Sequence, residues 1–383
     1  MIPYGRQSIG EDDIAALVDV LRSDWITTGP KIDEFEEEFA GFVQARHAVA
    51  VSSGTAALHA AMFAAGVRPG DEVIVPCLTF AASANAVVHQ GARPVFADVD
   101  DETLLIDPRR VESLVNDKTK AIVAVDYSGQ TCDFDALREV ADSHGLVLLD
   151  DACHSIGGGY RDRAAGSLAD LNTFSLHPVK NLTTGEGGMV TTDNRDYAEK
   201  MRRFRNHGIT SDHRRRADRG TWFYEMVELG YNYRITDFQC ALGISQLRKL
   251  PGWIRRRREI ASRYTDAFAS LADVRVPRTP PWSSPAWHLY VLRIDFRRLR
   301  RSRQQIMDRL REKGVGTQVH FIPVHLHPYY KNTFGTRAGL CPVAEAAYEQ
   351  LLSLPVYPAM SDVDVNRVIT AVSEVISQAP PPR

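Results

Sequence analysis

Short apolar runs alternate with helical patterns between residues 48 and 192, and this alternation constrains the fold of the 383-residue chain most strongly. Parallel strands need a long crossover, usually a helix, so that helices cover both faces of the sheet. The buried strands of such a sheet are short and almost continuously apolar. The runs that fit are Glu72–Pro76, Pro94–Val99, Ala121–Asp126, Leu146–Asp151, Asn172–Leu176 and Gly188–Thr192. The sequence therefore predicts an α/β fold with a mostly parallel sheet.

The remaining chain is predicted to be largely helical. The predicted helices are 11–22, 31–43, 236–270, 302–313 and one that begins at about residue 342. A strand at 287–294 follows the proline-rich connector 276–285 and indicates a smaller C-terminal α+β unit. We place a large domain at residues 1–250 and a small domain at residues 251–383, of which 379–383 form a disordered tail.

Composition excludes several classes of function. Apolar residues make up 44% of the chain and charged residues 25%, as in ordinary globular proteins. The formal net charge of -2 gives no overall attraction to nucleic acid or to an anionic membrane. There is no signal-peptide pattern at the N-terminus and no apolar run near the roughly 20 residues that span a bilayer. The five cysteines form no Cys-x-x-Cys pair, which fits a reducing compartment and predicts a cytoplasmic location.

One lysine is distinguished by its sequence context. Lys180 follows the apolar run Thr173–Leu176 and precedes the glycine-rich turn Gly185–Gly188. Removing an amine from water lowers its pKa and makes it a better nucleophile toward a carbonyl. Lys180 is therefore a candidate Schiff-base lysine, although most lysines are solvated surface groups.

Two carboxylates and a histidine follow the strand upstream of that lysine, in the run Asp150-Asp-Ala-Cys-His154. Ligands of parallel sheets bind beyond the carboxyl ends of the strands, so Asp151 is expected to point toward a ligand. A lysine for an aldehyde and a carboxylate for a pyridinium nitrogen are the pair that pyridoxal phosphate (PLP) chemistry requires. The alternative is that the acidic pair belongs to an ordinary turn or helix cap.

The segment Val49–Leu58 predicts a strand, a hydroxyl-rich turn and the start of a helix. Free N–H groups at a helix N-terminus bind anions, and the segment lacks the spacing of a nucleotide P-loop, which favours a single phosphate. An ordinary serine or threonine N-cap is the alternative. Phe80, after the next strand, would cover one face of a flat ring or lie in the core.

Two basic segments leave alternatives open. Asn232 and Arg234 precede the long helix and could reach an anion, whereas Thr236 or Asp237 would simply cap that helix. We interpret Arg214–Arg216 as a solvated loop, with a contact to a substrate diphosphate as the alternative.

Three histidines between residues 320 and 327 could in principle bind a metal ion. His325 and His327 would share one face of a strand, and His320 is close in sequence. A zinc site usually also draws on cysteines or further histidines, and no cysteine or acidic cluster accompanies these three in the sequence. We therefore expect no metal site.

Taken together and in chain order, these segments resemble the DegT/DnrJ/EryC1/StrS family of PLP-dependent sugar aminotransferases, from about residue 3 to residue 375. The resemblance implies an aspartate-aminotransferase-like large domain (PLP fold type I), a smaller domain and a homodimer with shared active sites. The motifs that carry it are Trp25–Pro30, Ser52–Ala56, Gly70–Pro76, Asp150–Ser155, Lys180 with Gly185–Gly188, Asn206–Gly208, Asn232–Asp237 and Ser353–Pro358.

The resemblance also implies roles for individual residues. Lys180 matches the lysine that binds PLP, Asp151 the partner of its ring nitrogen, and His154 a polar residue beside it. The family usually has Glu-Asp where this chain has Asp150-Asp151. The other expected cofactor contacts are Gly54, Thr55, Ala56 and Ser175 at the phosphate, Phe80 on the ring and Asn232 from the other subunit. The expected substrate contacts are Thr27, Thr28, His177, Arg234 and His320.

The implied function is a two-stage transamination, in which L-glutamate donates an amino group that passes to C4 of a nucleoside-diphosphate-linked 4-keto-6-deoxy sugar. His177, three residues before Lys180, and the run Asp126–Gly129 are similar to the C4-aminating branch, which makes precursors of pseudaminic-acid-type sugars. The alternatives are a C3-aminating or cyclitol aminotransferase, a PLP sugar dehydratase and a non-catalytic regulator on the same fold. Lys180 disfavours the dehydratase, whose relatives have histidine there, and Lys180 with Asp151 disfavours the regulator.

Overall fold

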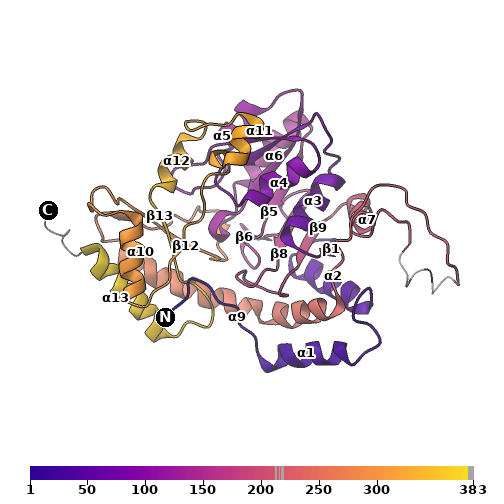
Figure 1. The fold of residues 1–383 in the computed structure, drawn as a ribbon, viewed down its shortest axis with the longest axis horizontal. Coiled ribbons are helices and arrows are strands. Elements are labelled where there is room, and N and C mark those ends of the chain that lie inside the picture. The colour runs from indigo at the N-terminus through magenta and orange to yellow at the C-terminus, as the bar shows by residue number, and fades with distance from the viewer. Residues whose placement is uncertain (212–213, 215, 217–219, 378–383) are drawn as a thin grey trace.

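A seven-stranded sheet forms the centre of the computed structural model, which describes residues 1–211, 214, 216 and 220–377 (Figure 1). Its strands are β1 (His47–Val51), β2 (Glu72–Pro76), β3 (Arg93–Ala97), β4 (Thr119–Val125), β5 (Val147–Asp151), β8 (Leu171–Ser175) and β9 (Gly188–Thr192). The strand order is β1-β9-β8-β5-β4-β2-β3. Only β9 runs antiparallel to its neighbours, which confirms the predicted mostly parallel sheet.

The predicted helices are confirmed as well, each within about two residues of its predicted ends. The helices are α1 (Glu11–Leu21), α2 (Pro30–Phe42), α3 (Gly54–Ala64), α4 (Ala81–His89), α5 (Pro108–Leu114), α6 (Phe134–His144), α7 (Arg195–Phe204), α9 (Asp237–Phe268), α10 (Arg303–Glu312), α11 (Pro328–Phe334), α12 (Pro342–Tyr348) and α13 (Asp362–Ser377). Short 3-10 turns occur at η1 (Tyr127–Gly129) and η2 (Val324–Leu326). Among the described helices, none is both long enough and apolar enough to cross a membrane.

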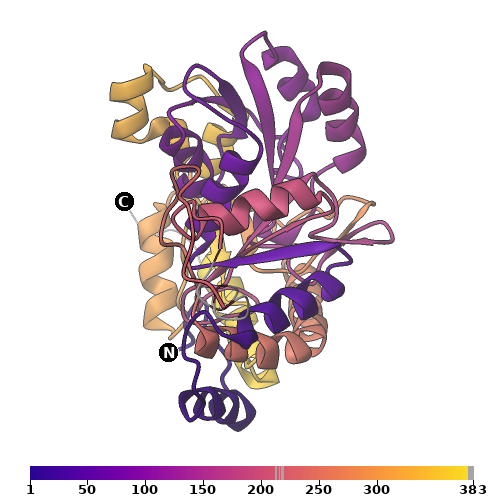
Figure 2. The same ribbon diagram turned by 90° about the vertical axis from the view of Figure 1, so that its right-hand side faces the viewer.

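Helices cover both faces of the sheet because successive residues of a strand point to opposite sides. In β1, Val49 and Val51 belong to the core beneath α3, α4, α5 and α6, whereas Ala48 and Ala50 belong to the core beneath α2 and the first half of α9. α1 lies outside this layer, along α9 (Figures 1 and 2). The same alternation decides which side chains at the strand ends reach a ligand.

A second hydrophobic core lies around a three-stranded sheet of β10 (Val274–Arg275), β12 (Tyr290–Ile294) and β13 (Leu351–Leu354). α10, α13 and the second half of α9 cover it, and the N-terminus lies on this side of the molecule (Figure 1). This is the smaller α+β unit that the sequence indicated, although β13 and α13 were not predicted. The predicted domain boundary at residue 250 falls inside α9 and stays a prediction, and the predicted tail at 379–383 lies outside the described residues.

The C-terminal segment also returns to the large sheet. Tyr330 of α11 and Ala344 and Ala347 of α12 lie in the core of that sheet. The connector forms part of a third small sheet, in which β11 (Ser283–Ser284) pairs with β6 (Gly159–Tyr160), and β6 with β7 (Arg163–Ala164). These contacts bring residues from the C-terminal part of the chain to the carboxyl edge of the large sheet.

Candidate active site

A cavity of about 390 Å³ opens where β5 and β8 end. Its lining includes Asp151, the last residue of β5, and Ser175, the last residue of β8. The residues predicted from sequence that line it are Gly54, Thr55, Phe80, Asp151, His154, Ser175, His177, Lys180 and His320. The structure thus brings together most of the predicted site, including all three residues expected to carry the chemistry.

Lys180 lies in a loop between β8 and β9 that its own hydrogen bonds fix. The Leu176 carbonyl accepts from the Thr183 hydroxyl at 2.9 Å and from the Thr184 N–H at 3.0 Å. The lysine itself is half-buried. Loss of solvent lowers the pKa of Lys180, and the neighbouring Cys153 and Asp151 oppose this only in part. A lowered pKa increases the fraction of free amine, the form that attacks a carbonyl.

Asp151 is held in place by contacts from two directions. Ser83 of α4 donates a hydrogen bond of 2.6 Å to Oδ2 of Asp151, and the Cys153 N–H donates one of 3.3 Å to Oδ1. The Thr79 hydroxyl lies 2.8 Å from the Ser83 hydroxyl behind this contact. A carboxylate so supported presents its charge to the cavity in a fixed orientation.

Asp150 points away from the cavity, because adjacent strand residues face opposite sides of the sheet. It is completely buried, and neither of its carboxyl oxygens has a hydrogen-bond partner among the described residues. Burial, reinforced by the charges of Asp126 and Asp151, raises the pKa of Asp150 well above its usual range. Burial likewise raises the pKa of Asp126 to about 7. Asp150 therefore favours its neutral form more than an ordinary aspartate does, and it faces away from any cation in the cavity.

Three neutral histidines surround the amine. The rings of His154 and His288 lie 4.4 Å apart between centroids. Burial, followed by the charges of nearby cations, lowers the pKa of both well below the usual value, and burial followed by Lys180 lowers the pKa of His320 to about 4. The Nδ1 atom of His154 is buried and has no hydrogen-bond partner among the described residues. A ligand in the cavity would satisfy that atom.

Aromatic rings form one wall of the cavity. Phe80 is 61% exposed, and its ring lies 5.9 Å from that of Phe321. The ring of Phe321 in turn lies 6.0 Å from that of His154, tilted by 24°. An exposed phenylalanine at a cavity mouth has an open face, so Phe80 is placed to cover a flat ligand rather than to fill the core.

The start of α3 forms another part of the cavity lining. Ser53 caps the helix by accepting a hydrogen bond of 3.1 Å from the Ala56 N–H, so the predicted contact residue Ala56 already serves the cap. A Cβ atom at Gly54 would lie 2.7 Å from Cβ of Ser175, which means that only glycine allows this approach of helix and strand. Gly54, Thr55 and Ser175 together offer N–H and hydroxyl donors suited to a phosphate.

The remaining predicted residues lie elsewhere in the chain. Thr28 and Arg234 line a second cavity, of about 510 Å³. Thr27 pairs with Thr236, and Asn232 with Asn206, through isolated backbone bridges. The arginines of this second cavity are Arg195, Arg202, Arg203, Arg205, Arg214 and Arg234. Over the described ranges, the lining of the first cavity contains none of the predicted residues Thr27, Thr28, Asn232 or Arg234.

The basic loop at Arg214–Arg216 is only partly described. Arg214 pairs with Asp33 and lines the second cavity, and the Arg216 guanidinium lies 4.6 Å from the centre of the Tyr224 ring. Arg215 lies outside the described residues. The two described arginines are thus engaged within the chain.

Several residues of the site escaped sequence reasoning. Ser83 lies four residues after Thr79 on the inner face of α4, and this spacing of hydroxyls was an available signal. His288, Tyr4 and Phe321 reach the cavity from distant parts of the chain, and nothing in their local sequence marks them. The complete site combines a nucleophilic amine, an oriented carboxylate, a stacking wall and an anion-binding helix start.

Comparison with known proteins supports this interpretation of the cavity. Residues 7–373 match the family described as DegT/DnrJ/EryC1/StrS aminotransferase family. The spore coat polysaccharide biosynthesis protein SpsC of Bacillus subtilis (strain 168) is 45% identical over 380 residues, which cover 99% of this chain and 98% of that protein.

Solved structures of similar proteins have the same fold. The putative sugar aminotransferase Spr1654 from Streptococcus pneumoniae, in its PMP-form, is 32% identical with a TM-score of 0.91, covering 98% of this chain and 99% of that one. Its PLP-form has a TM-score of 0.90 at 32% identity, over 98% of both chains. Helicobacter pylori PseC, an aminotransferase involved in the biosynthesis of pseudoaminic acid, has a TM-score of 0.91 at 29% identity, covering 98% of this chain and 99% of PseC.

Proposed function

We propose that this chain, which belongs to the DegT/DnrJ/EryC1/StrS aminotransferase family, transfers an amino group from L-glutamate to C4 of a nucleoside-diphosphate-linked 4-keto-6-deoxy sugar. It is a PLP-dependent sugar aminotransferase by family. The observation that carries the proposal is the convergence of Lys180, Asp151 and the start of α3 on one cavity.

The residues present fit PLP. Lys180 would hold the aldehyde carbon, Asp151 the ring nitrogen, and the N–H and hydroxyl groups of Thr55 and Ser175 the phosphate. The unpartnered Nδ1 of His154 would meet a polar group of the ring, and Phe80 would cover one face. When bound, this cofactor supplies an electron sink for the carbon that gains or loses the amino group.

The side chains of this chain then have separate tasks. Asp151, oriented by Ser83, would keep a proton on the ring nitrogen through a charge-assisted hydrogen bond. Lys180, once the amino donor has displaced it from the aldehyde carbon, would be a free amine with a lowered pKa and could carry a proton between the amino-bearing carbon and that carbon. The neutral histidines add polar contacts without competing positive charge.

We further propose that the active unit is a homodimer. Residues 205–211 and 220–229, between α7 and α9, extend away from the body of the molecule (Figure 1). The exposed apolar side chains among them are Trp222, Phe223, Tyr224, Met226, Val227 and Leu229, and Trp222 is 83% exposed. A patch of this kind marks an interaction surface. A second copy seated on it would bring Asn232 and Arg234 of one chain near the Lys180 cavity of the other.

Amination at C4 is supported by the residues next to the lysine. His177 is exposed and lines the cavity three residues before Lys180. The Tyr127 hydroxyl, in the run Asp126–Gly129, donates to the carbonyl of His320, and thereby joins this run to the cavity wall. A near-attack distance of about 3–3.5 Å for one carbon excludes its neighbour, so these walls select the carbonyl that reacts.

The test is to supply matched 4-keto and 3-keto sugar nucleotides with L-glutamate and to identify the products by NMR. We expect the 4-keto compound to be aminated faster, at C4. Faster amination of the 3-keto compound would overturn the regiochemical proposal and leave the aminotransferase assignment intact.

A further inference from the structure

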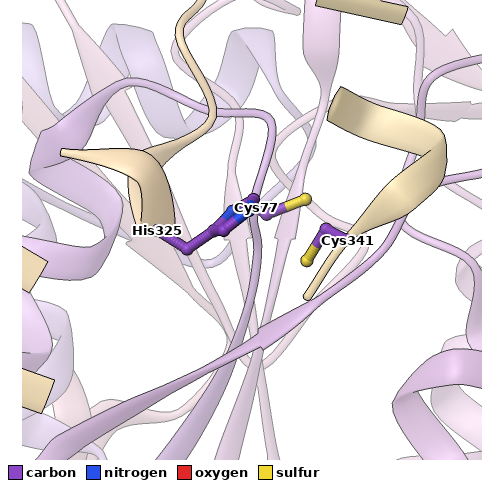
Figure 3. A group of neighbouring side chains, drawn as sticks. All are labelled: Cys77, His325 and Cys341. Carbon is purple, nitrogen blue, oxygen red and sulfur yellow. The ribbon is translucent and has the colours of Figure 1, made fainter. Parts of the chain in front are cut away.

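Two cysteines and one histidine meet in the interior, outside the lining of the proposed active site (Figure 3). Cys77 follows β2, His325 lies in η2, and Cys341 immediately precedes α12. All three side chains are completely buried. The two sulfur atoms and one imidazole nitrogen lie within 4.8 Å of one another. Segments that are far apart in sequence thus place three metal-binding side chains together.

The histidine is already oriented as a metal ligand would be. His325 Nε2 lies 2.9 Å from Oε1 of Glu345, whose carboxylate also accepts hydrogen bonds from the N–H groups of Gly339 and Cys341. A carboxylate in this position accepts a hydrogen bond from Nε2–H, so that the lone pair of the neutral ring is on Nδ1. Metal-bound histidines typically have such a carboxylate on the nitrogen that does not touch the metal.

The other nitrogen of the ring lacks a partner. His325 Nδ1 is buried and has no hydrogen-bond partner among the described residues. Buried polar atoms are rarely left unpaired, so an orphaned lone pair beside two sulfur atoms indicates a missing ligand. A cation would satisfy this nitrogen and both sulfurs at once.

We propose that Cys77, Cys341 and His325 bind a structural zinc ion. Thiolate and imidazole ligands favour zinc among the common divalent ions, whereas magnesium and calcium prefer oxygen. Each thiol loses its proton to solvent on binding, so the two thiolates balance the charge of one Zn²⁺. An oxygen of Asp98, 4.0 Å from Cys77 Sγ but outside the group of three, would turn inward as the fourth ligand and leave the zinc site with one net negative charge.

The geometry requires only a small contraction. From Zn–S distances of about 2.3 Å and Zn–N distances of about 2.0 Å, ligand atoms around a tetrahedral zinc lie about 3.5–3.8 Å apart. The present separations among the two sulfurs and the nitrogen reach at most 4.8 Å, so side-chain movements of about 1 Å bring these three atoms to a zinc ion. Asp98 is held nearby by the N–H groups of Val343 and Ala344 at the start of α12.

The ion would tie the C-terminal segment to the large sheet. Cys77 is two residues before Thr79 and three before Phe80, both of which line the active-site cavity. His325 is four residues after Phe321, whose ring lies beside that of Phe80 in the aromatic wall of the cavity. The sequence-based expectation of no metal considered His325 together with His320 and His327, whereas the proposed site joins His325 to two cysteines. His320 instead lies with its Nδ1 2.8 Å from the Ser353 hydroxyl.

The test begins with metal analysis of the full-length holoenzyme, purified without metal-affinity resin. We expect about one zinc per chain, and exchange with cobalt should give thiolate-to-metal charge-transfer absorption in the near ultraviolet. Cys77→Ser, Cys341→Ser and His325→Gln should each lose most of the metal. Cys240→Ser is the matched control, since Cys240 is equally buried but lies in α9, outside the cluster. It should retain the metal.

A chelator experiment on the wild-type protein covers the case in which the variants do not fold. Removing zinc should lower the midpoint of thermal unfolding and make two additional thiols reactive, while the absorbance of bound PLP reports separately on the active site. Absence of zinc together with absence of the cobalt band would overturn the proposal. So would a mass lower by two hydrogens that maps to a Cys77–Cys341 disulfide, or metal that remains in the Cys77→Ser/Cys341→Ser double variant.

Discussion

Ser83 Oγ donates a hydrogen bond of 2.6 Å to Oδ2 of Asp151, which joins α4 to the carboxyl end of β5. A hydrogen bond to a charged group contributes about 1.5–3 kcal/mol. Ser83→Ala should therefore lower kcat about tenfold or more, because Asp151 loses its orientation but keeps its charge. Steady-state kinetics with glutamate measure this, with the exposed Ser113→Ala as control. An unchanged kcat in Ser83→Ala would remove Ser83 from the positioning role.

The two adjacent aspartates should respond very differently to neutralisation. Asp151→Asn removes the charge that faces the cavity. Losing about 1.5–3 kcal/mol of transition-state stabilisation should lower kcat/KM by about 10–100-fold. Asp150→Asn should have a milder effect, because that side chain faces away from the cavity and burial raises its pKa. Kinetics of the glutamate half-reaction decide between them. The reverse order of effects would mean that the roles of the two residues are exchanged.

Lys180 should be the point of covalent attachment of PLP. Borohydride should fix the cofactor on the peptide that contains Lys180, as read by mass spectrometry after digestion. Lys180→Ala should bind PLP loosely and show no turnover, whereas the exposed Lys118→Ala should behave as wild type. A reduced adduct on any other lysine contradicts the assignment.

Asp126 should make the fold less stable as the pH rises. Its pKa is about 7 in the folded protein and near 3.8 when unfolded, so between these values the folded state binds more protons. The free energy of unfolding contributed by Asp126 then falls as pH rises from about 4 to 7, on the order of a few kcal/mol. The buried neutral histidines act in the opposite direction at acidic pH. The informative quantity is therefore the difference between wild type and Asp126→Asn in denaturant unfolding at each pH, and a difference that does not vary with pH would contradict the prediction.

Shared active sites predict complementation between inactive variants. In a heterodimer of Lys180→Ala with Asn232→Ala, one site keeps both native residues, so mixing the two proteins should restore part of the activity. Lys180→Ala mixed with Asp151→Asn is the control, because both changes affect the cavity of their own chain and no heterodimer has an intact site. Failure of the first pair after verified subunit exchange counts against a shared site.

Local sequence patterns were sufficient to predict much of this structure. The alternation of apolar runs located the strands, and the period of two along β5 explains why Asp151 and not Asp150 lines the cavity. Contacts between segments that are far apart in sequence could not be predicted in that way. His288 reaches the cavity from the segment just before β12 of the smaller unit, and Cys77, His325 and Cys341 converge only after three segments have folded together. In the proposed dimer, Asn232 would reach the cavity of a second chain, and a single chain does not show such a contact.

The helix α9 has a mechanical consequence. Its 32 residues extend over about 48 Å, with the first half in the core beneath the large sheet and the second half in the core of the smaller unit. A rotation of one unit relative to the other would have to bend α9 or remove one of its halves from the core in which it is packed. The two units are therefore expected to move as one stiff body, and entry of a bulky substrate must rely on side chains and loops at the cavity mouth.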